Sequence, residues 1–222
     1  MTETILECDA VLFDMDGTLV DSRQIVEATW LLWAAEHNLS AEAVLAVAHG
    51  RRTLETMQLL APDLATPEEA ARLDAREAEM EGHETPIAGA AALLAALPPE
   101  RWAVVTSAGR QLARTRLAAV GLPVPRVLVG ADDVDLGKPA PDGYLQAARA
   151  LGVSPARCVV LEDTPAGAQA GRAAGATVVG LCTTFPTVDG CDFLVPDLRA
   201  VRAVAAAHHP TLVRLMLTLT RG

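Results

Sequence analysis

Short apolar runs alternate with amphipathic segments along most of the chain, and this alternation predicts strands that are followed by helices. Buried strands are expected at 10–13, 102–105, 127–129, 158–161, 177–181 and 193–195. Helices are expected at 109–120, 142–151 and 165–174, and each is followed by a glycine that favours a helix stop. One further strand is predicted near the end of the chain by the alternation of Val213, Leu215, Leu217 and Leu219. Strands that alternate with helices indicate an α/β fold with a parallel sheet covered on both faces.

The segment between the first strand and the next has a different pattern, because it is helical and contains no convincing strand. Residues 22–80 carry apolar positions at helical spacing, beginning at Ile25, and Ser22 can cap the first helix. An insert of roughly 65 residues is long for a connection between strands. We therefore expect a small helical domain at 20–85 beside a core formed by 1–19 and 86–222.

Composition excludes several classes of function. The formal net charge of −10 argues against nucleic acid, whose phosphate backbone needs a basic surface. No apolar run reaches the roughly 18 residues that a membrane span needs, so no membrane partner is expected. The four cysteines show no CxxC spacing, which favours reduced thiols in a cytoplasmic protein.

Carboxylates gather where two of the predicted strands end. Asp14 and Asp16 follow the first strand two residues apart, and Glu162 and Asp163 end the strand at 158–161. Ligands bind open parallel sheets at the carboxyl ends of the strands. Carboxylates that converge there repel one another unless a cation or a shared proton intervenes. The pattern therefore predicts a site for an oxygen-preferring cation such as Mg²⁺.

Two further features indicate an anion site at the same edge. Residues 106–109, with Thr106 and Ser107 first, follow a strand and open a helix, where hydroxyls and free backbone N–H groups can bind phosphate. Of the 18 basic residues, 17 are Arg and one is Lys, at position 138. Arg and Lys differ in charge distribution and geometry, so a single retained ammonium marks Lys138 as a functional candidate.

The order and spacing of these residues resemble the four motifs of the haloacid dehalogenase superfamily of phosphatases. Those motifs are Asp14-x-Asp16-Gly17-Thr18, then Thr106, then Lys138-Pro139, then Glu162-Asp163. The helical insert resembles the C1 cap of that superfamily. The resemblance implies a Rossmann-like core with the active site beneath the cap.

The resemblance also implies a role for each catalytic residue. Asp14 would attack phosphorus and form an aspartyl-phosphate. Asp16 would protonate the leaving alcohol and then deprotonate water. Thr106 would hydrogen-bond a phosphoryl oxygen, and Lys138 would neutralise charge between Asp14 and the phosphate.

By the same resemblance, Mg²⁺ would be bound by Asp14, the backbone carbonyl of Asp16 and Asp163, with Glu162 direct or through water. Substrate contacts are expected from Gly17, Arg52, Ser107 and Ala108.

Other stretches, such as 49–53 in the cap and 101–107, are similar to the branch that acts on glycerol phosphate and deoxysugar phosphates. We therefore expect a small phosphorylated polyol or sugar as the partner, and a monomer or weak homodimer. A sugar phosphomutase is the alternative, since it shares all four motifs. A non-enzymatic phospho-binding domain of the receiver type is the third hypothesis, but such domains lack a helical insert after the first strand.

Overall fold

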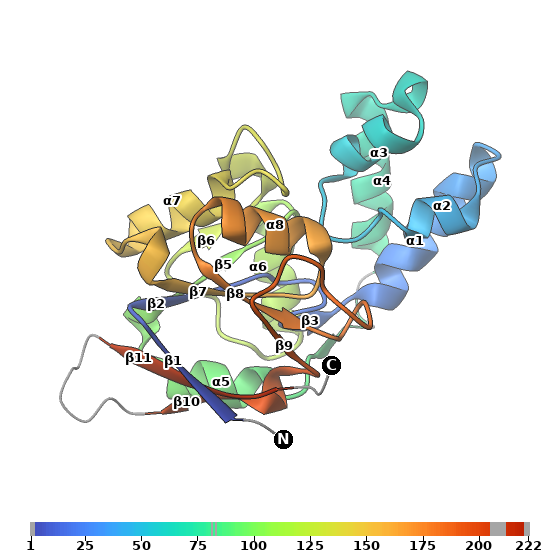
Figure 1. Ribbon diagram of the computed structural model, residues 1–222. Coiled ribbons are helices and arrows are strands. Elements are labelled where there is room, and N and C mark those ends of the chain that lie inside the picture. Colours follow the sequence, from blue (N-terminus) through green and yellow to red (C-terminus); the bar gives the residue numbers. More distant parts are fainter. Residues whose placement is uncertain (1–2, 81, 83, 205–211, 220–222) are drawn as a thin grey trace.

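A six-stranded parallel sheet forms the centre of the computed structural model, which describes residues 3–80, 82, 84–204 and 212–219 (Figure 1). Every pair of neighbours in this sheet is parallel. In spatial order its strands are β6 (Leu128–Val129), β5 (Trp102–Val105), β2 (Ala10–Phe13), β7 (Cys158–Glu162), β8 (Thr177–Leu181) and β9 (Phe193–Val195). The predicted α/β class and parallel sheet are confirmed, and all six predicted core strands are present.

Helices cover both faces of this sheet because each central strand is apolar on both sides. Side chains of β2 alternate between two cores: Val11 and Phe13 pack in one, and Ala10 and Leu12 in the other. The first core includes apolar residues of α5 (Ala90–Ala96) and α6 (Arg110–Ala119). The second includes residues of α7 (Asp142–Leu151) and α8 (Pro165–Ala173). Alanine dominates the buried faces of α7 and α8, which lets these helices approach the sheet closely.

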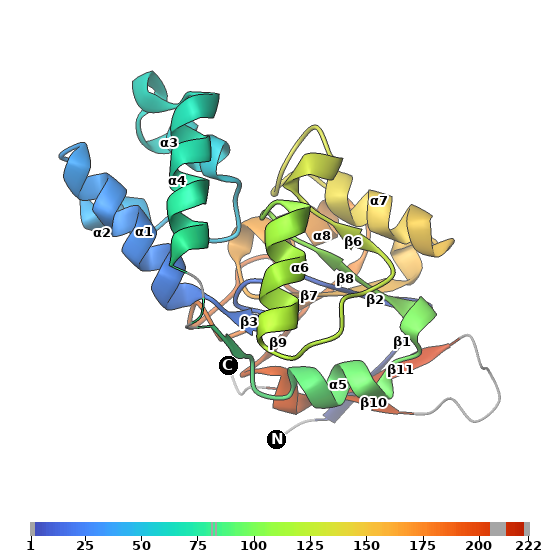
Figure 2. The same ribbon diagram turned by 180° about the vertical axis from the view of Figure 1, so that it is seen from behind.

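A second sheet lies below α5 and was only partly predicted (Figure 2). It is antiparallel, in the order β1 (Glu3–Cys8), β11 (Val213–Thr218) and β10 (Val201–Val204). The predicted alternation near the chain end is β11, whose Val213, Leu215 and Leu217 are buried. The sequence analysis missed β1, β10 and α5. Strand β1 carries few strongly apolar residues, and it forms by pairing with β11 from the other end of the chain.

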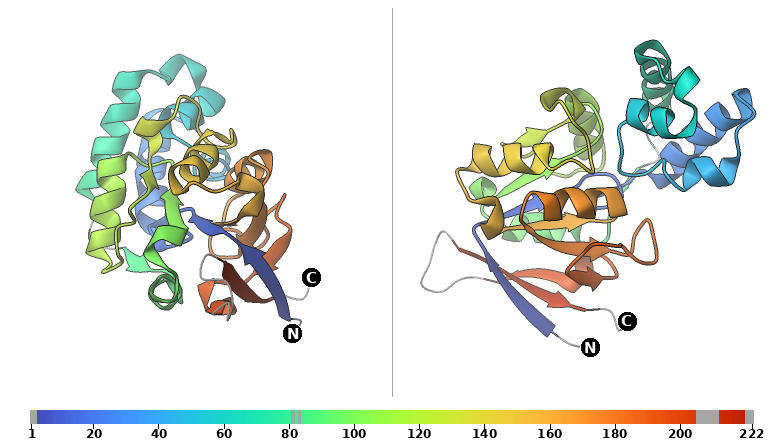
Figure 3. Two further views of the ribbon diagram at one scale, coloured as in Figure 1. Left: turned by 90° about the vertical axis from the view of Figure 1, so that its left-hand side faces the viewer. Right: turned by 45° about the horizontal axis from the view of Figure 1, so that its top comes forward.

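Four helices form a separate group on one side of the sheet, as Figures 1 and 3 show. They are α1 (Arg23–Glu36), α2 (Ala41–Leu45), α3 (Thr53–Leu60) and α4 (Pro67–Glu79). They bury their own apolar core, which includes Trp30, Trp33 and Met57. The chain enters and leaves this group through a two-stranded antiparallel ribbon of β3 (Val20–Asp21) and β4 (Thr85–Pro86). We refer to α1–α4 as the cap. Among the described residues, no helix is both long enough and apolar enough to cross a membrane.

Candidate active site

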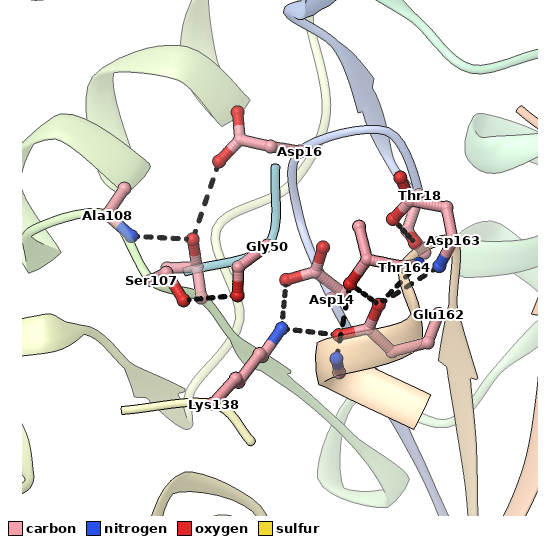
Figure 4. A network of polar contacts seen from close by, with 12 residues as sticks. Asp14, Asp16, Thr18, Gly50, Ser107, Ala108, Lys138, Glu162, Asp163 and Thr164 are labelled. Atoms are coloured by element: carbon pink, nitrogen blue, oxygen red, sulfur yellow. Dashed lines mark hydrogen bonds and ion pairs between the residues drawn. The ribbon is translucent and has the colours of Figure 1, made fainter. Parts of the chain in front are cut away.

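The ends of neighbouring strands β2 and β7 bring three carboxylates together. Asp14 follows β2, Glu162 ends β7, and Asp163 comes next (Figure 4). One oxygen from each lies within 4.8 Å of the others, and all three side chains are buried. These strands pair in register, with Phe13 opposite Leu161, so their adjacent ends place the acids side by side. The predicted convergence of Asp14, Glu162 and Asp163 is therefore present in the structure.

Lys138 provides the positive charge within this cluster. Its buried Nζ donates hydrogen bonds to Asp14 Oδ1 at 2.5 Å and to Glu162 Oε1 at 2.6 Å. Burial alone would lower the pKa of Lys138, but the Asp14 and Glu162 carboxylates raise it above its ordinary value. Burial and the charge of Glu162 raise the pKa of Asp14 well above its ordinary value, although Lys138 opposes that rise. The lone lysine is thus a fixed cation beside Asp14.

Both carboxylate oxygens of Glu162 accept hydrogen bonds. Oε1 accepts from Lys138 and from the Tyr144 hydroxyl at 3.0 Å. Oε2 accepts from the backbone N–H groups of Asp163 and Thr164 and from the Thr164 hydroxyl. These contacts fix Lys138 and the turn into α8. The predicted role of Glu162 as a direct metal ligand would require it to share an oxygen that already accepts at least two hydrogen bonds.

Asp163 keeps one oxygen available. Its Oδ1 accepts from the Thr18 hydroxyl at 2.9 Å, while the buried Oδ2 accepts no hydrogen bond of acceptable geometry from the described residues. Gly17 makes room for that oxygen: its φ is +80°, and an added Cβ would lie 2.0 Å from Asp163 Oδ2. Both backbone polar groups of Gly17 are paired, the N–H with Val20 and the carbonyl with Thr183. Gly17 therefore shapes the carboxylate cluster, and its backbone N–H is already used within the loop.

An unpaired buried carboxylate oxygen beside two further acids fits the requirements of a divalent cation. A hard cation prefers oxygen ligands, and it relieves repulsion that a buried acidic cluster otherwise suffers. Burial, followed by the charge of Glu162, raises the pKa of Asp163 to about 7, and the nearby Thr184 hydroxyl and the hydrogen bond from Thr18 only partly oppose this rise. The residues present therefore fit a metal site at Asp14 and Asp163.

In EDTA, the stability of the protein is expected to decrease as pH rises from about 4 to about 7. The folded chain keeps a proton on Asp163 up to a pKa of about 7, whereas the unfolded chain releases it near the ordinary aspartate pKa of 3.8. Deprotonation therefore favours the unfolded state, and the raised pKa of Asp14 acts in the same direction. Denaturant titrations at about pH 5 and pH 8 measure this slope. Mg²⁺ should restore stability at the higher pH, because it binds the ionised folded state.

The matched variant for this experiment is Asp163→Asn, which should flatten the decrease because its amide does not titrate. Equal stability of the wild-type protein at the two pH values in EDTA, or no gain in stability from Mg²⁺ at about pH 8, would contradict the assignment of a metal site to the cluster.

Asp16 lies outside the three-carboxylate cluster, and Figure 4 shows its side chain turned away from Asp14. Its Oδ1 accepts from Ser22 Oγ at 2.6 Å and from Arg116 Nη1 at 2.9 Å. Its Oδ2 faces the Thr106 hydroxyl at 3.5 Å. The expectation that Ser22 caps α1 is half right: Ser22 occupies the N-cap position, but its hydroxyl makes no capping hydrogen bond and binds Asp16 instead.

At the predicted anion site, at the start of α6, the polar groups already have hydrogen-bond partners within the protein. The Ala108 backbone N–H donates to Thr106 Oγ1 at 3.0 Å. The Ser107 hydroxyl donates to the Gly50 carbonyl at 3.0 Å and so joins the core to the cap. Thr106 itself is buried, and its hydroxyl lies 3.5 Å from Asp16 Oδ2.

A cavity of about 560 Å³ lies between the cap and the core. Six of the predicted site residues line it: Asp14, Asp16, Arg52, Thr106, Ser107 and Ala108. The other four, Gly17, Lys138, Glu162 and Asp163, are not part of its lining. Arg52 reaches from the start of α3 to the core, where it donates to the carbonyls of Val134 at 3.0 Å and Asp135 at 3.3 Å. The cavity can hold a small organic molecule with Asp14 in its wall.

Two further residues that contact the site, Tyr144 and Arg116, were not predicted from the sequence. Tyr144, on α7, donates to Glu162. Arg116, on α6, donates to Asp16, but it could not be distinguished among 17 arginines. The available signal was its register: Ala113, Arg116 and Leu117 share the buried face of the helix, where a charged side chain needs a partner.

The site therefore combines a parallel α/β core, an inserted cap and a buried carboxylate–lysine cluster at the strand ends. Residues 8–175 match the haloacid dehalogenase-like hydrolase family, and the chain belongs to that family. The resemblance inferred from the four motifs is therefore confirmed, and the chain is an enzyme.

Named relatives agree with this assignment. Hexitol phosphatase A of Escherichia coli is 42% identical over 181 residues, covering 79% of this chain and 84% of the relative. Glycerol-1-phosphate phosphohydrolase 2 of Saccharomyces cerevisiae is 36% identical over 213 residues, covering 89% and 85%. A hydrolase structure from Pseudomonas syringae superposes with a TM-score of 0.76 at 28% identity, covering 86% of this chain and 94% of that one.

Proposed function

We propose that the protein is a Mg²⁺-dependent phosphatase that hydrolyses a small phosphorylated polyol or sugar through an aspartyl-phosphate. The observation that carries this proposal is the position of Asp14: it lines the cavity and is hydrogen-bonded to the buried Lys138 within the acidic cluster. A carboxylate next to a fixed ammonium and a metal site can attack phosphorus, because both cations offset its repulsion by the phosphate.

The proposed reaction has two displacements. In the first, an Asp14 oxygen bonds to phosphorus while the bond to the leaving alcohol oxygen breaks, and Asp16 donates a proton to that oxygen. In the second, Asp16 accepts a proton from water as the water oxygen bonds to phosphorus and the Asp14–phosphorus bond breaks. Inorganic phosphate leaves, and Asp14 returns to its free form. Asp16 is suited to this work because its carboxylate lines the cavity outside the acidic cluster.

The surrounding residues have supporting roles in the proposal. Mg²⁺, when bound by Asp14, Asp163 and the Asp16 backbone carbonyl, supplies positive charge for the phosphoryl oxygens. Lys138 holds Asp14 and neutralises charge beside it, and Glu162 holds Lys138 in turn. Thr106 is placed to donate its hydroxyl to a phosphoryl oxygen once it releases Asp16.

Two observations support a small polyhydroxylated leaving group. The cavity is also lined by charged residues, including Arg52, Asp74 and Asp132, whose side chains can hydrogen-bond hydroxyl groups. The relatives are named as phosphatases of hexitol and glycerol phosphates.

Every residue in the proposal comes from one chain, so a monomer or weak homodimer suffices. Four free cysteines fit a cytoplasmic enzyme.

Phosphate release from a panel of polyol and sugar phosphates, measured with Mg²⁺ or with EDTA, tests the proposal. Release is expected only with Mg²⁺, and fastest with small polyol or sugar monophosphates. Isomerisation of a sugar phosphate without net phosphate release would favour the phosphomutase alternative. A stable phosphoprotein that does not turn over would favour a phospho-binding domain.

A further inference from the structure

A buried arginine joins the core, the cap and Asp16. Arg116 projects from the core helix α6, and its side chain is 1% exposed. Its Nη1 donates to Asp16 Oδ1 at 2.9 Å, and its Nη2 donates to Oε1 of Glu77, on cap helix α4, at 2.6 Å. Its Nε lies 3.7 Å from Glu84, in the segment by which the chain leaves the cap. Figure 2 shows α4 and α6 on the facing sides of the cap and the core.

Acidic side chains from the cap side and from the core surround Arg116, so that this arginine links the two parts. The side chains of Glu77 and Glu84 are 14% and 1% exposed, so both acids are largely removed from water with the guanidinium. The single positive charge of Arg116 therefore has two other carboxylates near it besides that of Asp16. Arg116 can then fix the orientation of the Asp16 carboxylate, because a planar guanidinium donates hydrogen bonds in fixed directions to partners on different sides.

The two carboxylate oxygens of Asp16 have different contacts, and this gives them different roles. Oδ1 is held by two donors, Arg116 and Ser22. Among the residues that the structure describes, Oδ2 has only the long 3.5 Å contact with Thr106. Asp16 lines the cavity and its side chain is 26% exposed, so Oδ2 is the oxygen left to exchange a proton with a substrate there.

We propose that Arg116 is a positioning residue that sets the orientation of Asp16 as the acid of the reaction, and that its hydrogen bond to Glu77 makes this orientation depend on contact with cap helix α4. The inference rests on the proposed phosphatase function. It predicts that loss of Arg116 harms the reaction only where the leaving oxygen needs a proton.

The test compares two substrates, glycerol phosphate and p-nitrophenyl phosphate, by kcat/KM. This constant reports steps up to the first irreversible one, here loss of the leaving group. An alkoxide needs a proton to leave, whereas nitrophenolate is a weak base and does not. Arg116→Met should lower kcat/KM for glycerol phosphate by roughly 10- to 100-fold, as expected when a catalytic group is misplaced. For p-nitrophenyl phosphate the loss should stay below about threefold.

Two further variants separate positioning from folding. Arg116→Met leaves Glu77 and Glu84 without their partner, so Arg116→Lys is tested beside it: Lys keeps the charge but cannot reach Asp16 and Glu77 in the same fixed geometry. It should show the same selective loss. Arg114→Met removes an exposed arginine from the same helix and should leave both substrates unaffected.

A double-mutant cycle identifies Asp16 as the target. In an Asp16→Asn background, Arg116→Met should cause no further loss with glycerol phosphate. Equal losses with both substrates in Arg116→Lys, no loss in either Arg116 variant, or fully additive losses in the cycle would overturn the role of Arg116 while leaving the phosphatase proposal intact. A wild-type protein that releases phosphate from neither substrate, nor from any other member of the polyol and sugar phosphate panel, would overturn both.

Discussion

Asp14→Asn is expected to lower phosphate release by at least about 10⁴-fold, because the amide cannot attack phosphorus and no covalent intermediate can form. Asp14 is buried, lines the cavity and accepts from Lys138, so no other described carboxylate has the same position. Initial rates of phosphate release with Mg²⁺ measure the effect. Asp63→Asn, an exposed change in the cap, is the matched control and should keep wild-type turnover.

The folded structure should survive this substitution. Asn has nearly the shape of Asp, and it removes one of three neighbouring negative charges from a buried cluster. Thermal unfolding followed by circular dichroism in EDTA should show a variant at least as cooperative as the wild-type protein. Substantial turnover by a folded Asp14→Asn protein would rule out Asp14 as the nucleophile.

Lys138→Met is expected to damage both activity and stability. Turnover should fall by roughly 10³- to 10⁵-fold, the range found when a cation is removed from a phosphoryl-transfer site. Without Mg²⁺, stability should fall by about 3–5 kcal/mol, because the buried Asp14 and Glu162 carboxylates lose their shared partner. Chemical denaturation in EDTA measures the stability, and Arg149→Met, at an exposed position on α7, is the control.

Lys138→Arg distinguishes charge from geometry at the same position. The ammonium fits between Asp14 and Glu162 with both contacts under 3 Å, in a region with almost no exposed surface. A planar guanidinium is larger and cannot take that place without displacing one acid. We expect no recovery of turnover. Full activity in this variant would show that only the charge matters and that the single lysine of the chain has no special role.

The local hydrophobic pattern was sufficient to predict the parallel core, because few other folds can bury continuous apolar runs that are bounded by turns and helices. It was insufficient for β1, β10 and α5. Strand β1 has an exposed–intermediate burial pattern up to Cys8, and only its pairing with β11, about 200 residues away, makes it a strand. Long-range pairing of this kind leaves little trace in a local window.

For the site, the sequence determined which residues meet: adjacent parallel strands must bring Asp14, Glu162 and Asp163 to one edge of the sheet, and a lone lysine among arginines identified their cation. Tertiary structure decided how the side chains are used. It directed Asp16 away from the cluster toward Arg116, and it occupied both oxygens of Glu162 with donors from three segments. The physical reason is that strand register fixes the position of a backbone, while a side chain turns toward whichever partner satisfies its charge, and that partner comes from elsewhere in the chain.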